Sequence, residues 1–139
     1  MAHIGTNENA QAASPSLPKP DVLSPDCPSR AILQHVTSRW GTLVLIVLDA
    51  KVLRFSDLKR RIGGVSDRML AQTLQVLEAD GLILRHAFDV VPPHVEYRLT
   101  PLGAEVSNRV LSLASLIEAN LPQFLSQRPK RPAAAQTVR

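Results

Sequence analysis

The sequence is poor in cysteine and in aromatic residues, and it has no long apolar run. One cysteine, Cys27, stands among 139 residues, and aromatic side chains make up 4% of them. A single cysteine excludes an intramolecular disulfide framework, and the lack of disulfides is typical of a cytosolic protein. The longest aliphatic run, Leu43 to Leu48, is too short to span a bilayer, and the first residues do not resemble a signal peptide. We therefore expect a cytoplasmic chain that does not enter a membrane.

Motifs for catalysis and for metal binding are also lacking. We find no glycine-rich phosphate loop, no nucleophile elbow and no spaced pair of carboxylates. The residues best suited to bind a metal are scattered without ligand spacing; they are Cys27, His35, His86 and His94. The sequence therefore predicts neither an enzyme nor a cofactor or metal site.

Apolar residues make up 45% of the chain, which allows a folded core, and the formal net charge of +4 suits a polyanionic partner. Residues 1–26 are rich in Pro, Ser, Ala and Asn and predict a flexible tail. Residues 127–139 form a second predicted tail, which is rich in Pro and Ala and basic. The sequence therefore predicts one folded domain over residues 27–126.

Helical spacing of apolar residues appears in five segments. The first segment follows Pro28, and the other four run from Trp40 to Leu48, Ser56 to Ile62, Ser66 to Asp80 and Thr100-Pro101 to Leu121. Ser56 and Ser66 are suited to cap the helices that follow them. Gly63-Gly64 and Gly81 are suited to end helices.

Strand signals surround the fourth of these helices. Leu53 to Phe55 is a short strand-like segment, and Leu82 to Phe88 and Val95 to Leu99 flank a loop that contains Pro92-Pro93. The latter two segments are expected to pair as a hairpin. The order of helix, helix, turn, helix and hairpin predicts a mainly α fold with a small β-hairpin wing (α+β), the winged helix-turn-helix.

The segment from Ser66 to Asp80 has the pattern of a DNA recognition helix. If its leucines line the buried face, Arg68, Gln72, Gln75 and Ala79 fall on the opposite face. Arginine can bind guanine and glutamine can bind adenine in the major groove, while the first N–H groups of the helix can donate hydrogen bonds to a phosphate oxygen. An ordinary solvated face is the alternative, and the preceding helix, the Gly-Gly turn and the wing favour DNA contact.

Basic residues gather just before this helix. From Arg54 to Arg68 there are five cations and two acids, an arrangement that would face DNA phosphates or serve only solubility. The candidate DNA-binding residues come from both helices and the hairpin; they are Arg54, Lys59, Arg60, Arg61, Ser66, Asp67, Arg68, Ala71, Gln72, Gln75, His94 and Arg98.

The last predicted helix carries more apolar residues than one buried stripe requires, because Leu111 and Leu116 lie outside that stripe. This excess predicts a homodimer, although the stripe could also pack on its own domain. Two recognition helices would then lie about one DNA turn apart, roughly 34 Å, on a palindromic operator. The candidate interface residues are Ala31, Val106, Val110, Leu113, Ile117 and Leu121.

Six stretches, in this order, resemble the HxlR-type winged helix-turn-helix regulators of the MarR-like group. They are Cys27-Pro28, Arg39-Trp40, Arg54 to Leu58, Gly64 to Ser66 with Met69-Leu70, Leu77 to Ile83 and Pro92 to Gly103. The resemblance implies a dimeric repressor or activator that binds double-stranded DNA at the nucleoid. It also implies that the cysteine region and the last helix lie at the dimer interface. Thr73 and Gln75 stand where the family usually has arginine, and Arg39 stands where it has lysine, which bears on the operator sequence.

Several members of that family sense oxidants or electrophiles, and Cys27 is the candidate sensing residue. The unpaired N–H groups of a helix that begins at Pro28 favour a thiolate, as does Arg30, whereas Asp26 opposes it. A small packing side chain is the alternative role for Cys27. The predicted function is sequence-specific transcriptional regulation. The alternatives are a winged helix used for protein–protein contact and a regulator that responds to a small-molecule ligand.

Overall fold

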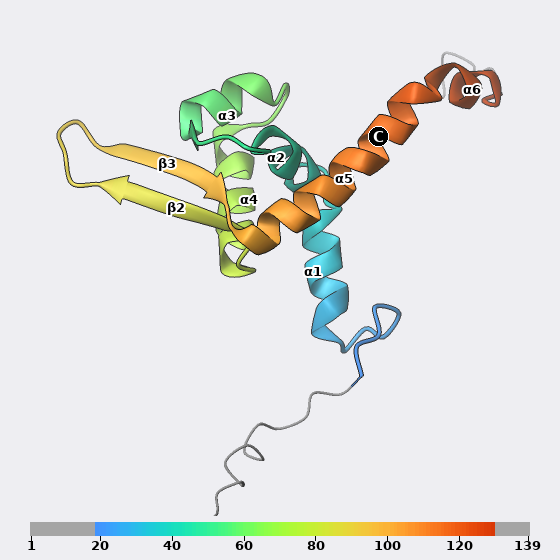
Figure 1. Cartoon of the computed structure of the whole chain (residues 1–139), viewed down its shortest axis with the longest axis horizontal. Helices are drawn as coiled ribbons and strands as arrows, with labels where there is room; N and C mark the ends of the chain where they lie inside the picture. The colour runs from blue at the N-terminus through green and yellow to red at the C-terminus, as the bar shows by residue number, and fades with distance from the viewer. Residues whose placement is uncertain (1–18, 130–139) are drawn as a thin grey trace, which may run out of the picture. The chain divides into compact units, whose positions relative to one another are not determined.

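The computed structural model describes residues 19–129, and the chain divides between Gln34 and His35 into two units. In the first unit, turns at residues 21–26 lead into α1 (Pro28–Val36), which begins at the predicted proline and whose last two residues belong to the second unit. The second unit, described over residues 35–129, carries all the later elements (Figure 1). Positions 1–18 and 130–139, which hold most of the two predicted tails, lie outside the described residues.

Within the described residues, five further helices and three strands follow α1. The helices are α2 (Gly41–Val47), α3 (Phe55–Arg61), α4 (Asp67–Ala79), α5 (Pro101–Ala119) and α6 (Leu121–Ser126). In Figure 1, α5 passes α2 and ends in α6 at the side away from the hairpin. Within residues 19–129, no helix is both long enough and apolar enough to cross a membrane.

The strands form one antiparallel sheet in the order β1-β3-β2, with β1 (Leu53–Arg54), β2 (Ile83–Phe88) and β3 (His94–Leu99). The predicted hairpin is confirmed, since Arg85 lies opposite Tyr97 and His86 opposite Glu96. The short strand-like segment has a role that the sequence left open. It pairs with β3, with Leu53 opposite Tyr97.

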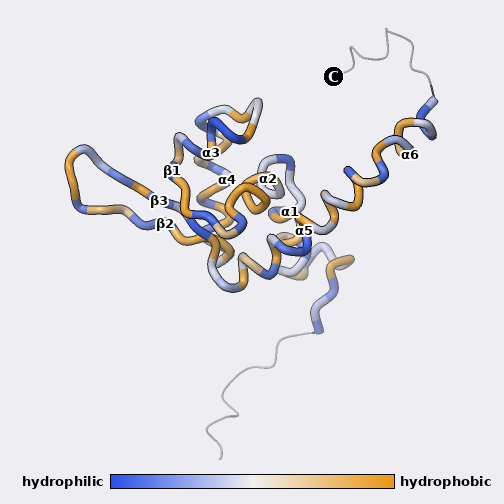
Figure 2. The backbone as a smooth tube through the Cα atoms, turned by 45° about the horizontal axis from the view of Figure 1, so that its top comes forward, coloured by the Kyte–Doolittle hydropathy of each residue, from blue (hydrophilic) through white to orange (hydrophobic). Residues whose placement is uncertain are grey.

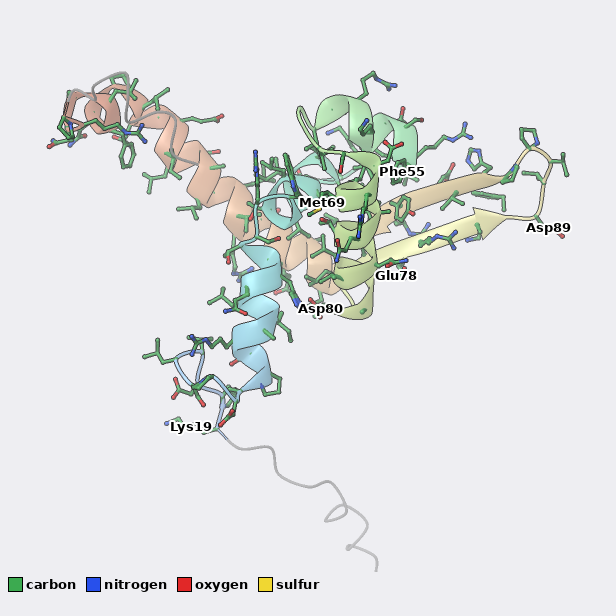
Figure 3. The ribbon with its side chains drawn as sticks, turned by 180° about the vertical axis from the view of Figure 1, so that it is seen from behind. Lys19, Phe55, Met69, Glu78, Asp80 and Asp89 are labelled. Carbon is green, nitrogen blue, oxygen red and sulfur yellow. The ribbon has the colours of Figure 1, made fainter. Side chains whose placement is uncertain are left out.

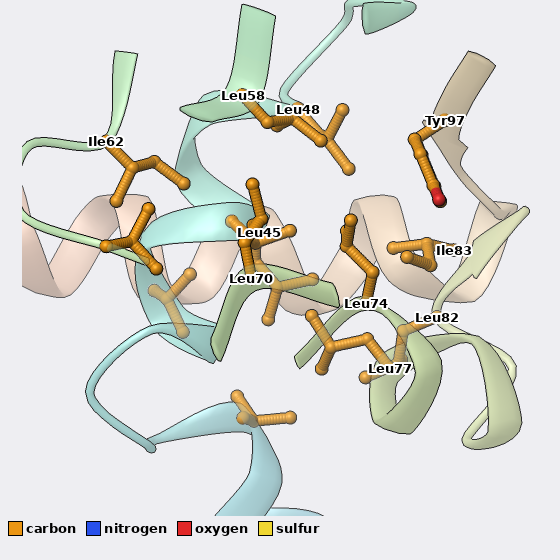
Figure 4. Packing of buried hydrophobic residues seen from close by; sticks show 14 residues of the cluster. Leu45, Leu48, Leu58, Ile62, Leu70, Leu74, Leu77, Leu82, Ile83 and Tyr97 are labelled. Carbon is orange, nitrogen blue, oxygen red and sulfur yellow. The ribbon is translucent and has the colours of Figure 1, made fainter. Parts of the chain in front are cut away.

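Leucines from α2, α3 and α4 pack together in one hydrophobic core. The buried leucines include Leu45 of α2 and Leu48 at its C-cap, Leu58 of α3, and Leu70, Leu74 and Leu77 of α4 (Figure 4). Figure 2 shows α2 in the colour of apolar residues over most of its length. The buried Ser107 hydroxyl of α5 donates a hydrogen bond to the Leu45 carbonyl at 2.7 Å, which ties α5 to α2. The line of leucines predicted for α4 is therefore its buried face.

Helix caps agree with the sequence at α4 and differ at α3. The Ser66 hydroxyl accepts the Met69 N–H at 3.1 Å, and Gly81 has a φ of +79°, as a helix-ending glycine requires. Ser56, however, is not the cap of α3. The Asp57 carboxylate accepts the Arg54 N–H at 3.1 Å, so Arg54 becomes the N-cap and the helix begins at Phe55.

The long last helix is interrupted, contrary to the prediction that it runs through Leu121. α5 ends at Ala119, and α6 begins after Asn120. Pro122 has no N–H to donate to the carbonyl of Glu118, so the hydrogen-bond ladder of α5 cannot continue past it. The Asn120 side-chain amide instead donates to the Leu116 carbonyl at 2.9 Å.

Three elements meet at the start of α5. The Thr100 hydroxyl accepts the Gly103 N–H at 2.8 Å and donates to the Gly81 carbonyl at 2.7 Å. Gly103 lies so close to the sheet that an added Cβ would collide with the Leu82 carbonyl. The end of α4, the approach to β2 and the start of α5 are therefore fixed at one point, the Thr100 junction.

Candidate nucleic-acid interface

α4 presents an open polar face opposite its buried leucines. The side chains at the predicted contact positions are all exposed; they are Arg68, Ala71, Gln72 and Gln75. The predicted orientation of this helix is therefore confirmed, although its contact with DNA stays a prediction. Met69 and Glu78 mark the two sides of the face, with Glu78 toward the hairpin (Figure 3).

The N-terminus of α4 is suited to an anion, although it also carries an acid. The first N–H groups of a helix lack intrahelical partners, and the capping hydroxyl of Ser66 engages the one from Met69. Asp67, at the first position, would repel a phosphate. Its carboxylate lies 3.1 Å from the Lys59 ammonium, which offsets that charge.

The basic residues of α3 differ in how free they are. Arg60 pairs with Asp57 at 2.7 Å, and Lys59 pairs with Asp67, while Arg61 is exposed. The Arg54 backbone N–H and then the Arg60 guanidinium lower the pKa of Asp57, so this carboxyl stays charged. Ion pairs between exposed side chains contribute little to stability, so DNA phosphates could replace Asp57 and Asp67 as the partners of Arg60 and Lys59.

The hairpin places its charged residues on two different faces. Arg85 lies opposite Tyr97, on the face that meets α4, whereas Arg98 and His94 lie opposite Leu84 and Phe88 on the other face. A hollow of about 450 Å³, the hairpin hollow, separates α4 from the strands; it is lined by Phe55, Ala71, Gln75, Glu78, Arg85 and Tyr97. The structure therefore brings Arg85 to the exposed face of α4.

His94 and Arg98 are not brought to that hollow. The His94 Nε2 lies 2.7 Å from the Glu96 carboxylate, and Arg98 lines a separate hollow with Lys51 and Val52. From the sequence, Arg85 was one of the hairpin residues that could reach the flanking DNA, but it was not selected as a site residue. The two-residue period of the strand, counted from the buried Tyr97, is the signal that could have identified it.

A second residue missed by sequence reasoning is Arg39. Its guanidinium lies 4.6 Å from the centre of the Trp40 ring, next to the side of α4 that carries Met69. Arg39 departs from the lysine usual in the resembled family, but no pattern in the sequence predicts that this residue lies beside α4.

Cys27 has polar partners within the first unit. Its Sγ lies 3.4 Å from the Asp21 backbone nitrogen, which donates to it, and 3.0 Å from the Ser29 hydroxyl. These hydrogen bonds lower the pKa of the thiol, with partial burial and the Asp21 carboxylate acting against them. The expected influence of Arg30 differs, because its guanidinium donates to the Leu23 carbonyl instead.

The predicted dimer residues divide between buried and exposed positions. Val110 is buried in the core of the second unit, and Val106 packs against that core. Ala31 is exposed on α1. The exposed apolar side chains along the outer part of α5 and on α6 form what we call the α5–α6 face; they are Leu113, Leu116, Ile117, Leu121, Phe124 and Leu125.

Comparison with known proteins identifies the family. A model of HxlR-like helix-turn-helix proteins matches residues 35–124. The HTH-type transcriptional regulator YtfH of Escherichia coli K12 is 56% identical over 120 residues, which are 86% of this chain and 95% of that protein. The solved structure of Salmonella typhimurium ytfH is also 56% identical, with a TM-score of 0.76 over 81% of this chain and 100% of its own.

The redox regulator HypR, solved in its reduced form, is 30% identical and has a TM-score of 0.66 over 71% of this chain and 98% of its own. These likenesses confirm the predicted winged helix-turn-helix fold. The chain therefore belongs to the HxlR-like helix-turn-helix family and is a transcriptional regulator of the helix-turn-helix type.

Proposed function

We propose that the protein binds a specific palindromic operator as a homodimer, with the exposed face of α4 in the major groove. The exposed face, opposite a fully buried leucine line and next to the basic α3, carries this proposal. Arg68 and Gln72 supply hydrogen-bond groups suited to base edges. Arg61 and Lys59 lie where they can reach the flanking phosphates, which position the protein without reading sequence.

The α5–α6 face supports the homodimer. Leu113, Leu116 and Ile117 are 55%, 60% and 43% exposed, and Phe124 of α6 is 49% exposed. Contiguous apolar side chains of this number are uncommon on the free surface of a monomer. A second copy of the same face is the occupant that we propose, because a symmetric pair also places two α4 helices for two half-sites.

We further propose that Cys27 makes DNA binding sensitive to electrophiles. Its hydrogen bonds from the Asp21 N–H and Ser29 favour the thiolate, which is the reactive form. The similar protein HypR is named a redox regulator, which supports the proposal that this chain also has a sensing role. With a quinone, the thiolate sulfur would bond to a ring carbon, and the ring would become a hydroquinone thioether after uptake of one proton.

The central experiment is footprinting on genomic fragments, beginning with the DNA beside the protein's own coding region. We expect protection of two half-sites one helical turn, or a multiple of it, apart. Affinity should also fall steeply as salt rises from about 50 to 200 mM, as phosphate contacts require. Absence of protection and of salt-dependent binding would favour the protein–protein alternative. For Cys27, the matched comparison is operator affinity of the wild type and Cys27→Ser with and without the quinone.

A further inference from the structure

A second hollow lies on the other side of α4 from the hairpin, within residues 35–129. It holds about 450 Å³ between the turn that precedes α2 and the flank of α4, and we call it the Trp40 hollow; its walls include Arg39, Trp40, Met69, Thr73 and Val76. Ligand pockets span about 300 to 1,000 Å³. Since an engineered cavity of about 150 Å³ holds benzene, this hollow has room for a ligand of one or two rings.

Most of the lining is apolar and suited to a flat ring. Trp40 offers its indole, Val76 and Leu77 offer aliphatic groups, and Met69 offers a thioether. A thioether and an indole both contact aromatic rings favourably. Trp40 is half-buried and packs against the core, so this wall is held in place.

The polar groups of the hollow select an anion. Among residues 19–129, no carboxylate pairs with Arg39, whose guanidinium stands over the Trp40 ring at 4.6 Å. The nearby acid is Asp80, which does not line the hollow and whose Oδ2 lies 2.6 Å from the Nδ1 of His35. An unpaired guanidinium binds a carboxylate through two parallel hydrogen bonds.

We propose that the Trp40 hollow binds a small planar aromatic carboxylate, with the ring against Trp40 and Met69 and the carboxylate on Arg39. Gln72 lines the same hollow and also stands on the exposed face of α4. A bound anion at Gln72 would repel DNA phosphates and occupy a side chain suited to base contact. The ligand would therefore weaken DNA binding, a consequence that rests on the proposed function.

Binding itself can be measured without DNA, because Trp40 is the chain's one tryptophan and its fluorescence reports on this hollow. The probe is 4-chlorobenzoate, excited at wavelengths that this acid does not absorb. We compare it with 4-chlorobenzyl alcohol, which has the ring without the charge, and with inorganic phosphate, which has charge without the ring. A saturable change in fluorescence, confirmed by calorimetry, is expected for the acid and a weaker one for the alcohol.

Three variants identify the contact. Arg39→Gln should weaken binding of 4-chlorobenzoate about tenfold or more, since a hydrogen bond to a charged group is lost. Arg39→Lys should retain part of the affinity, because the charge remains. The matched control is Arg109→Gln, an exposed cation on α5 outside the hollow, which should bind like the wild type. Circular dichroism checks that each variant is folded.

Three results would overturn the proposal: no saturable signal by either method, an unchanged affinity in folded Arg39→Gln, or phosphate bound as tightly as the acid. The last result would assign Arg39 to the DNA backbone instead. In the DNA arm, the acid should weaken operator binding about tenfold in the wild type and leave Arg39→Gln unaffected. Acid binding without this effect overturns the coupling. Acid binding by a chain that binds no DNA refutes the proposed function and leaves the ligand site standing.

Discussion

Replacing Arg68 and replacing Arg61 should weaken DNA binding in two different ways. Arg68 is the second residue of α4 and is exposed at its N-terminal end, while Arg61 is exposed at the end of α3. The neighbouring acid Asp67 is held by Lys59 at 3.1 Å, which leaves the Arg68 guanidinium available to a base. We therefore expect Arg68 to contribute to sequence discrimination and Arg61 to general affinity.

The expected magnitudes follow from these positions. A guanidinium that binds one guanine through two hydrogen bonds contributes about 1–3 kcal/mol of discrimination, or about 5- to 150-fold. Arg68→Ala should lose this factor for the operator and little for random DNA. Arg61→Ala should weaken both DNAs alike and reduce the slope of log K against log salt by about one.

Fluorescence anisotropy with the footprinted operator and a scrambled duplex, at several salt concentrations, separates the two effects. Arg109→Ala on α5 is the control for loss of an exposed cation that lies away from α4. If Arg68→Ala keeps the ratio of operator to random affinity of the wild type, α4 does not read bases through this face. If Arg61→Ala leaves the salt slope unchanged, Arg61 contacts no phosphate.

Three further predictions concern the rest of the molecule. Leu116→Asp should give a monomer by sedimentation at micromolar concentration, and a variant that stays dimeric would exclude the α5–α6 face as the interface. Ser29→Ala should raise the pKa of Cys27 and move its alkylation rate profile to higher pH, because the thiolate loses a donor; an unchanged profile would deny Ser29 that role. Gly103→Ala should lower the free energy of unfolding by about 1–3 kcal/mol in thermal denaturation, through its collision with the sheet. Gly63→Ala is its control, because a Cβ at Gly63 would meet no atom of residues 19–129 within 4 Å.

Much of α4 could be predicted because its signals are local. Ser66 before the helix, Gly81 after it and leucines at helical spacing agree with one another, and the structure confirms all three. The start of α3 was predicted wrongly because two adjacent polar residues, Ser56 and Asp57, can each accept a hydrogen bond from a backbone N–H at a helix N-terminus. The carboxylate of Asp57 bonds the Arg54 N–H, and Ser56 is left inside the helix.

The candidate interface was less predictable, since its details depend on contacts between elements. The ion pair of Lys59 with Asp67 joins α3 to α4 across a turn, and the spacing of residues within either helix does not predict it. The choice between Arg85 and Arg98 depends on which face of the hairpin meets α4, which the pairing with Tyr97 fixes. Arg39 reaches α4 only through the tertiary packing of the turn before α2.

The Thr100 junction limits how this protein can be recombined with its relatives. One hydroxyl holds the end of α4 and the first turn of α5, and Gly103 packs directly on the Leu82 carbonyl. A chimera that takes its DNA-reading half from one regulator and its long helix from another must therefore inherit residues 81–103 from a single parent. A crossover inside that segment would combine Thr100 or Gly103 of one parent with the carbonyls of residues 81 and 82 from the other parent. Crossover points beyond Val110, in the exposed part of α5, leave this junction and the core intact and exchange the surface that we propose for dimerisation.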